Sequence, residues 1–113
     1  MYIGEWENSK ANGRGKYVHS DGAEYEGEWK DDQQEGFGKE SWPDNASYEG
    51  YYHLGKKHGK GVFRWEDGSK YDGSFDSNDI DGYGEYKWAD GRKYIGNDAQ
   101  RWNLMLNRRM KEE

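Results

Sequence analysis

A pattern that recurs every 23 residues, with no insertion between copies, constrains this chain more than any other feature of its sequence. Each copy opens with the motif Tyr-x-Gly, and an aromatic residue follows two positions after the glycine. The full copies begin at Tyr2, Tyr25, Tyr48 and Tyr71. A partial fifth copy begins at Tyr94 and then fails, because Asp98 stands at its aromatic position. A fixed period of this length is typical of repeat proteins in which each unit packs against its neighbours.

Two further signatures divide each repeat into two short strands. A Gly-x-Gly pair lies in the middle of every repeat, beginning at Gly13, Gly36, Gly59 and Gly82. An Asp-Gly or Asp-Asn pair closes every repeat, beginning at Asp21, Asp44, Asp67 and Asp90. These turn residues tolerate the positive φ that tight hairpins require. The pattern predicts an all-β fold for residues 1–96: an elongated, twisted, single-layer antiparallel sheet of tandem β-hairpin repeats.

Alternation along the strands assigns the side chains to two faces of the sheet. One face is aromatic, and its glycines leave gaps where a neighbouring ring can lie on bare backbone. The other face is charged, with acids on one strand opposite bases on the next, which helps to fix the register. The aromatic face collects Tyr2, Trp6, Tyr17, Tyr25, Trp29, Trp42, Tyr48, Tyr52, Phe63, Trp65, Tyr71, Phe75, Tyr86, Trp88 and Tyr94.

The combination of Tyr-x-Gly-x-Trp, Gly-x-Gly and Trp-x-Asp-Gly at this spacing resembles the MORN repeat family (membrane occupation and recognition nexus). The resemblance covers residues 1–96. It implies an elongated antiparallel sheet with a concave aromatic side, and roles in scaffolding, in ciliary or cytoskeletal organisation and in the docking of partner helices. The family name also records a suspected membrane or phosphoinositide role. Four positions depart from the pattern: His19 and Glu40 replace aromatic residues, Asn45 replaces a turn glycine, and Asp98 ends the aromatic series.

Composition disfavours several classes of function. The net charge is −6, so the chain gains little from counterion release at nucleic acids, and the same sign opposes anionic membrane surfaces. There is no cysteine for disulfides or thiol chemistry. No apolar run approaches the roughly 20 residues that span a bilayer, and Met1 leads directly into the repeats without a signal peptide. We therefore expect a cytoplasmic protein, associated with the cytoskeleton or a cilium if the resemblance extends to location.

Residues 97–113 differ from the repeats, because they contain no glycine and carry a net positive charge. Asn97 followed by Gln100 resembles a helix-capping pair, and the segment is predicted to form a short amphipathic helix that caps the array. Its apolar strip consists of Trp102, Met105, Leu106 and Met110. Two alternatives stay open: a damaged fifth repeat in which Trp102 is the displaced aromatic residue, and a disordered end. A homodimer could form through this helix or through the open N-terminal edge.

No catalytic or ligand-binding constellation emerges from the sequence. His53 and His58 share one turn segment with no carboxylate or cysteine at ligand spacing, and they are interpreted, with His19, as surface loop residues. The Gly-x-Gly pairs lie within strands and lack the setting of a nucleotide-binding loop. We therefore expect no enzyme, no cofactor and no metal site. The turns inside the repeats (residues 7–12, 30–35, 53–58 and 76–81) are expected to be solvent-facing loops under little constraint.

The aromatic face is the best candidate for function, because an exposed apolar surface usually marks a contact site. We predict a non-enzymatic scaffold that binds an amphipathic helix of a partner protein along an aromatic groove. The alternative is a phosphoinositide- or membrane-targeting module, such as the regulatory part of a lipid kinase, but the basic residues alternate with acids and do not cluster. The predicted groove residues are Tyr25, Trp29, Trp42, Tyr48, Tyr52, Phe63, Trp65, Tyr71, Phe75, Tyr86, Trp88 and Tyr94.

Overall fold

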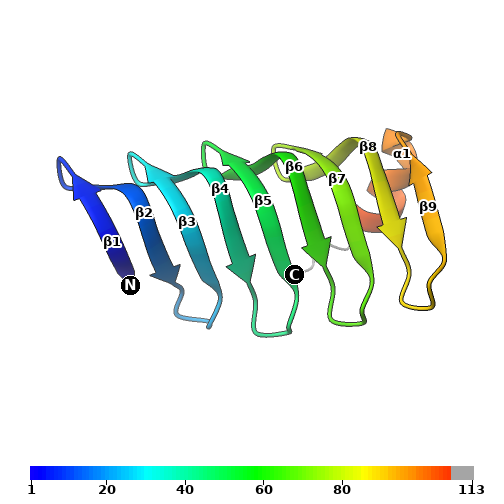
Figure 1. The fold of residues 1–113 in the computed structure, drawn as a ribbon, viewed down its shortest axis with the longest axis horizontal. Coiled ribbons are helices and arrows are strands. Elements are labelled where there is room, and N and C mark those ends of the chain that lie inside the picture. The colour runs from blue at the N-terminus through cyan, green and yellow to red at the C-terminus, as the bar shows by residue number, and fades with distance from the viewer. Residues whose placement is uncertain (108–113) are drawn as a thin grey trace.

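The computed structural model, which describes residues 1–107, confirms the all-β prediction. Nine strands form one open sheet, and every strand pairs antiparallel with its neighbours in the chain. They lie side by side along the long axis of a molecule that measures 46 × 25 × 19 Å (Figure 1). The strands are β1 (Tyr2–Glu7), β2 (Lys10–Val18), β3 (Glu24–Lys30), β4 (Gln33–Ser41), β5 (Ser47–His53), β6 (Lys56–Arg64), β7 (Lys70–Asp76), β8 (Asp79–Lys87) and β9 (Lys93–Gly96).

The turns inside the repeats are tight, so the prediction of loosely constrained loops is wrong. Each turn has two residues outside the strands, at positions 8–9, 31–32, 54–55 and 77–78. All of these residues have positive φ, as in the third repeat, where Leu54 has a φ of 52° and Gly55 a φ of 80°. Two successive positive φ values give the turn the twist that a two-residue hairpin requires.

These turns are also bonded to the preceding repeat. The amide of Asp32 donates to the carbonyl of Ala11 (3.0 Å), and the Asp32 carboxylate accepts from the amide of Ala11 (2.6 Å). Asn78 makes the same pair of hydrogen bonds with Lys57, each 2.9 Å long. The turn of the third repeat makes the corresponding backbone bond at 3.0 Å. Neighbouring hairpins are thus joined at their turns as well as along their strands.

The turns between repeats have a second recurrent geometry. In the first of them the amide of His19 donates to the carbonyl of Ala23 (2.8 Å), and Gly22 takes a φ of 96°. The Asp21 carboxylate accepts from the amide of Ala23 (3.0 Å), and the aspartates of the three later turns do the same. Asn45 takes a φ of 73° in place of a glycine. The aspartate therefore caps the turn, and the next residue supplies the positive φ.

A row of glycines crosses the sheet, one in each strand, and the tyrosine that opens each repeat lies over it. An added Cβ at Gly15 would collide with the Tyr2 ring, and one at Gly61 would collide with the Tyr48 ring. Each tyrosine hydroxyl donates to a main-chain carbonyl three residues further on, at 2.8 to 3.0 Å in the four full repeats. The row consists of Gly4, Gly15, Gly27, Gly38, Gly50, Gly61, Gly73, Gly84 and Gly96.

A short helical segment follows the last strand, as predicted. Helix α1 (Ala99–Trp102) continues into one π-helical turn, η1 (Asn103–Asn107). In Figure 1 the helix lies behind β8 and β9, so it covers the C-terminal end of one face of the sheet. The part of the predicted helix after residue 107 lies outside the described residues. Neither helical segment in the described chain is long and apolar enough to cross a membrane.

A methyl group at Gly61 is expected to destabilise the fold by about 1–3 kcal/mol, the usual cost of overpacking. The new Cβ would collide with the Tyr48 ring, which is fully buried. Lys60→Ala, an exposed neighbour on β6, is the control and should change the free energy of unfolding by less than about 0.5 kcal/mol. Urea unfolding followed by tryptophan fluorescence measures both. A Gly61→Ala variant as stable as the parent would show that the tyrosine does not need bare backbone.

Candidate functional site

One continuous series of ring contacts, here called the ring ladder, runs along the aromatic face. It alternates between the tyrosine that opens a repeat and the aromatic residue four positions later. Tyr25, for example, meets Trp29 of its own repeat and Tyr52 of the next, both edge to face at 5.1 Å. All the contacts have the edge-to-face geometry that aromatic pairs favour, with centroids 4.9–5.3 Å apart. In order, the rings are Trp6, Tyr2, Trp29, Tyr25, Tyr52, Tyr48, Phe75, Tyr71, Trp102 and Tyr94.

The C-terminal end of the ring ladder is completed by the helix. Trp102 contacts both Tyr71 and Tyr94 at 5.2 Å, in the way that Phe75 bridges the two preceding tyrosines. The Trp102 side chain is completely buried. It therefore fills the aromatic position at which Asp98 stands in the sequence. Trp102 therefore combines two predictions: it belongs to the predicted C-terminal helix, and its ring is the displaced aromatic residue of the fifth repeat.

Asp98 has a role of its own, because its carboxylate begins the helix. It accepts hydrogen bonds from the amides of Gln100 (3.0 Å) and Arg101 (3.2 Å), which are the second and third residues of the first turn. The predicted cap of Asn97 with Gln100 is therefore wrong by one residue. The substitution that removes an aromatic residue from the fifth repeat is the same one that starts the helix.

The helix docks on the aromatic face through two apolar side chains four residues apart. Leu106 is buried beside Trp102, whose indole N–H donates to the carbonyl of Gly82 (3.0 Å). Met105 is half-buried against the same cluster, whereas Leu104 points away and is 71% exposed. Met110, the fourth residue of the predicted apolar strip, lies outside the described residues.

Most of the predicted groove residues are core. Eight of the twelve are less than 5% exposed, because neighbouring rings and backbone cover them within the chain. The other four are half-buried, so part of each ring is exposed to solvent. The buried eight are Tyr25, Tyr48, Tyr52, Phe63, Trp65, Tyr71, Phe75 and Tyr86, and the half-buried four are Trp29, Trp42, Trp88 and Tyr94.

A second row of rings lies beside the ring ladder, and Glu40 interrupts it. From Trp42 the row continues through Phe63, Trp65, Tyr86 and Trp88. Glu40 stands at the position that Phe63 occupies one repeat later, and its carboxylate accepts a hydrogen bond from the Tyr52 hydroxyl (2.8 Å). The ammonium of Lys57 lies 5.5 Å from the Trp42 ring centroid. An acid and a base thus occupy the middle of an otherwise aromatic face.

Burial controls ionisation on this face. Burial, reinforced by the charge of Glu40, raises the pKa of Tyr52 far above its ordinary value. Burial also lowers the pKa of Lys57, an effect that the charge of Glu40 opposes. In the ring ladder, burial raises the pKa of Tyr71 to about 12. The pKa values of Tyr25 and Tyr48 are raised further, again chiefly by burial. These tyrosines stay neutral in the folded chain.

On the N-terminal side of this interruption the aromatic face has a hollow of about 280 Å³. Trp29 forms part of its wall, half-buried, with its indole N–H donating to the carbonyl of Gly15 (3.0 Å). The imidazole of His19 is exposed, and its ring centroid lies 4.6 Å from that of Tyr17. Of the lining residues, sequence reasoning had included only Trp29 in the groove. The lining, here called the N-terminal hollow, consists of Tyr17, His19, Trp29, Asp32, Gln33, Gln34 and Gly55.

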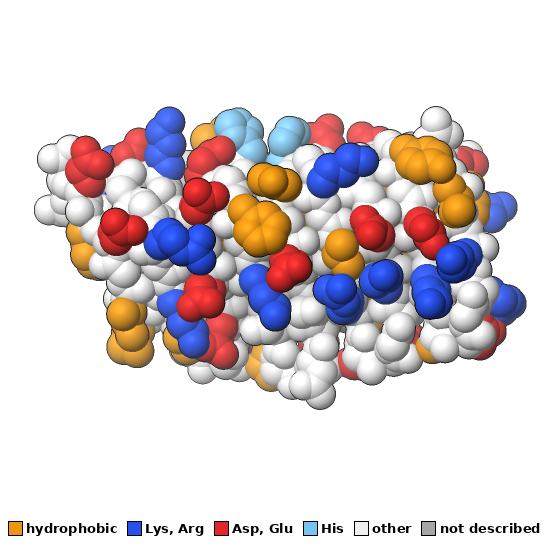
Figure 2. All heavy atoms as spheres, viewed as in Figure 1, with side chains coloured by type: hydrophobic (Ala, Val, Ile, Leu, Met, Phe, Trp, Pro, Cys, Tyr) orange, Lys and Arg blue, Asp and Glu red, His pale blue; other side chains and the backbone are white. Residues whose placement is uncertain are grey.

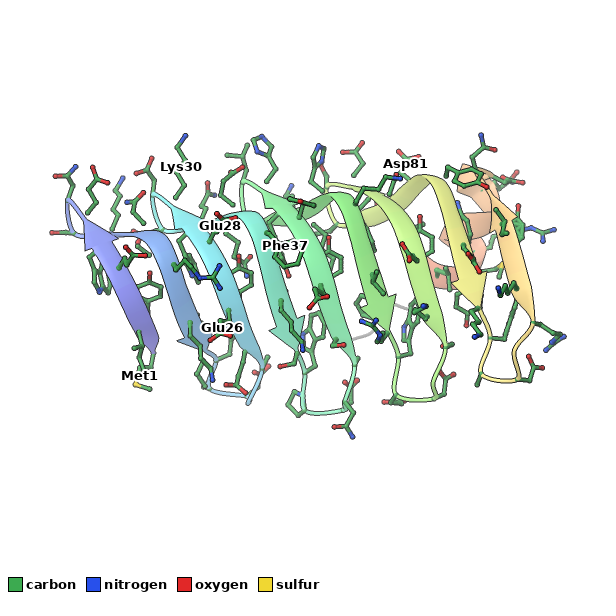
Figure 3. The ribbon with its side chains drawn as sticks, viewed as in Figure 1. Met1, Glu26, Glu28, Lys30, Phe37 and Asp81 are labelled. Carbon is green, nitrogen blue, oxygen red and sulfur yellow. The ribbon has the colours of Figure 1, made fainter. Side chains whose placement is uncertain are left out.

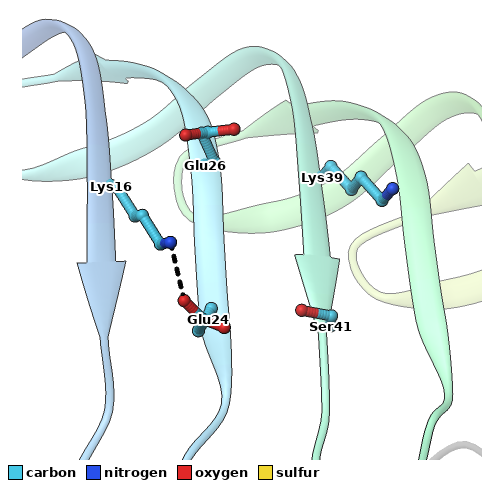
Figure 4. Close-up of a pocket in the computed structure, with 5 residues that line it drawn as sticks. All are labelled: Lys16, Glu24, Glu26, Lys39 and Ser41. Carbon is cyan, nitrogen blue, oxygen red and sulfur yellow. Dashed lines mark ion pairs between the residues drawn. The ribbon is translucent and has the colours of Figure 1, made fainter.

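The opposite face, here called the outer face, carries mixed acids and bases over its N-terminal strands, while basic side chains gather over β6 to β9 (Figure 2). Figure 3 labels Glu26, Glu28 and Phe37 among its side chains. The ammonium of Lys16 forms an ion pair with the Glu24 carboxylate (2.8 Å), and this hydrogen bond raises the pKa of Lys16. The pair borders a hollow lined by Lys16, Glu24, Glu26, Lys39 and Ser41 (Figure 4). Two lysines and two glutamates balance each other, so the hollow offers no excess of positive charge to an anionic group.

Removal of the Trp102 ring is expected to destabilise the C-terminal end of the array. Trp102→Ala should lower the free energy of unfolding by about 3–5 kcal/mol, the usual range for a buried tryptophan, because two ladder contacts are lost. Leu104→Ala, at an exposed position on the same helix, is the matched control and should cost less than about 0.5 kcal/mol. Urea unfolding gives both values, and light scattering reports any dimer with exchanged helices. Equal, small losses in the two variants would show that the helix does not support the sheet.

The buried tyrosines predict a loss of stability at alkaline pH. Burial raises the pKa values of Tyr25, Tyr48, Tyr52 and Tyr71 in the folded chain above the ordinary tyrosine value of about 10, so the unfolded chain releases their protons first. Their contribution is fully present below about pH 10 and is lost above it, at about 1.4 kcal/mol per pH unit for each tyrosine. Unfolding by urea at a series of pH values, with phenolate absorbance as a second signal, tests this. Tyrosines that ionise well before the chain unfolds would contradict it.

The repeats match a known family along most of the chain. The MORN repeat model matches four consecutive segments, residues 2–24, 25–47, 48–70 and 71–91, whose boundaries follow the tyrosines of the ring ladder. A comparison with curated proteins returned no match. MORN repeats in general form non-enzymatic modules that interact with proteins or membranes. On the match to these four segments, this chain belongs to the MORN repeat family.

Proposed function

We propose that the chain is a scaffold module that binds an amphipathic helix of a partner protein in the N-terminal hollow of its aromatic face. One observation carries the proposal: a helix of the chain itself already occupies the C-terminal end of the same face. Helix-in-groove recognition of this kind uses apolar anchors three or four residues apart. Trp102 and Leu106 have that spacing and are both buried against the sheet.

The N-terminal hollow has the features that would receive a similar helix. Trp29 and Tyr17 line it with half-buried rings, which suit an apolar or aromatic anchor. Asp32, Gln33 and Gln34 line the hollow beside these rings and give it a polar rim, as protein–protein interfaces commonly have. The net charge of −6 favours the approach of a helix with basic residues on its solvent side.

A protein partner is better supported than a membrane surface. Adsorption to anionic lipid requires several lysines or arginines gathered on one surface. At the N-terminal end of the outer face the lysines stand among glutamates, as Lys16 does beside Glu24 at 2.8 Å. The aromatic face holds Lys57 with Glu40 close enough to influence its pKa. One basic row does lie on the outer face, where Arg64, Lys70, Lys87 and Lys93 are register partners on β6 to β9, and it is the surface that the membrane alternative would use. The net charge of −6 opposes that alternative.

Substitutions at the rim of the N-terminal hollow should weaken partner binding without unfolding the chain. His19→Arg and Gln33→Arg introduce bulk and positive charge at exposed positions, so a basic helix should lose at least about tenfold in affinity. Tyr83→Arg, at a 62% exposed position on β8, is the matched control and should bind like the parent. A photo-crosslinking residue at position 33 would first capture the partner, and titration of the purified partner with each variant then gives the affinities.

Three results would overturn the proposal. The first is a purified partner whose crosslinked segment is not helical. The second is an equal loss of affinity in Tyr83→Arg and Gln33→Arg, which would mean that the contact is not confined to the hollow. The third is co-sedimentation of the chain with phosphatidylserine vesicles that weakens with added salt while no protein crosslinks, which would establish the membrane alternative.

A further inference from the structure

Four titratable side chains form a line across the outer face beside the turns inside the repeats. Glu35 belongs to β4, His53 to β5, His58 to β6 and Asp76 to β7. The strand register places Glu35 opposite His53 and His58 opposite Asp76. In each case the adjoining residues of the two strands are paired. Figure 2 shows two imidazoles at this edge of the sheet, coloured pale blue. Three consecutive repeats contribute to the line.

The two histidines lie in paired strands, so their interpretation as loop residues is wrong. Only Leu54 and Gly55 lie between β5 and β6, and His53 pairs with Lys56 at the end of the hairpin. Alternation places Lys56 and His58 on the same face, which brings the two imidazoles side by side. Their ring centroids are 5.7 Å apart. A rigid hairpin therefore fixes the separation of the rings.

Each imidazole has a carboxylate at its Nδ1 atom. Glu35 Oε2 lies 3.0 Å from His53 Nδ1, and Asp76 Oδ1 lies 3.5 Å from His58 Nδ1. The other oxygen of Glu35 accepts from the amide of Leu54 (3.2 Å), so this carboxylate is held in place. A carboxylate that accepts a hydrogen bond from Nδ1–H leaves the lone pair of a neutral imidazole on Nε2. This is the arrangement that orients histidines as metal ligands in proteins.

We propose that His53 and His58 bind one divalent transition-metal ion through their Nε2 atoms, with Glu35 and Asp76 orienting the rings and water completing the coordination. Imidazole nitrogen binds such ions at about 2.0–2.1 Å, which places each ring centroid about 3 Å from the metal. Two rings on one ion can thus be up to about 6 Å apart, and the observed 5.7 Å is within this limit. Imidazole ligands suit Cu²⁺, Ni²⁺ and Zn²⁺, with Cu²⁺ bound most tightly.

The surroundings favour an ion that enters and leaves readily. The side chains of His53 and His58 are 55% and 49% exposed, so an ion can reach both rings from solvent. The two carboxylates supply negative charge that balances the ion. No cluster of three or more metal-ligating side chains exists among the described residues, so the remaining coordination positions belong to water. The site is therefore open and exchangeable, unlike a closed structural zinc site.

Titration of the full chain with Cu²⁺, followed by calorimetry and electron paramagnetic resonance, tests the site. One equivalent should bind with a nitrogen-coordinated spectrum, and His53→Ala and His58→Ala should each abolish that binding. His19→Ala is the control: it removes the third histidine, which lies on the aromatic face, and should leave Cu²⁺ binding unchanged. Glu35→Gln keeps both imidazoles and should weaken binding by about 10- to 100-fold, the usual effect of losing an orienting carboxylate. Circular dichroism checks that every variant is folded.

Nuclear magnetic resonance with Zn²⁺ gives an independent reading. The imidazole ¹⁵N signals should show that Nε2 is the ligand in both rings and that Nδ1 keeps its proton. The proposal fails if Nδ1 is the ligand, if either single histidine variant still binds one equivalent of Cu²⁺, or if His19→Ala removes the binding. It also fails if Glu35→Gln binds as tightly as the parent, since the carboxylate would then have no orienting role.

Discussion

A tyrosine ring resting on bare glycine backbone is the interaction on which this structure depends. A single-layer sheet has no second layer to cover its apolar face, so the rings must be covered within the layer itself. The glycine row lets each tyrosine ring approach the main chain of two strands. The tyrosine hydroxyl then donates a hydrogen bond to a main-chain carbonyl. The ring of the next repeat then closes over the tyrosine edge to face. The core is consequently one ring thick and continuous from Trp6 to Tyr94.

The same arrangement limits where the molecule can interact. Rings that support one another are buried, so an unbroken repeat offers a partner few apolar atoms. Openings occur where the pattern departs from its consensus: His19, which lines the N-terminal hollow, and Glu40 stand where the other repeats have rings, and Lys57 replaces the apolar residue found at Ile80. Each departure weakens the packing of the array and at the same time leaves a surface with its own chemistry. The tightest packing and the open surface thus lie in different repeats of one motif.

The strands, their pairing and the two faces could be predicted from the sequence, because a strict period places equivalent residues in equivalent positions. The depth of each ring could not, since alternation distinguishes faces but not the amount of cover; Tyr52 and Trp29 occupy the same repeat position with different exposure. The constraint on the inner turns could not be predicted, because main-chain hydrogen bonds such as that from Asp32 to Ala11 supply much of it and leave no mark in the sequence. The carboxylates beside His53 and His58 come from neighbouring repeats, so no local spacing reveals them.

Trp102 shows how such an array can vary in length. Each 23-residue unit returns the chain to the same register, so duplication or deletion of one unit at the gene level would lengthen or shorten the sheet without disturbing its neighbours. Termination requires much less: one codon changed from aromatic to aspartate both removes a ring and starts a helix. That helix then returns a ring to the vacant place from outside the sheet. The segment from Asn97 to Asn107 is in this sense a terminating cap that evolution can join to an array of any number of repeats.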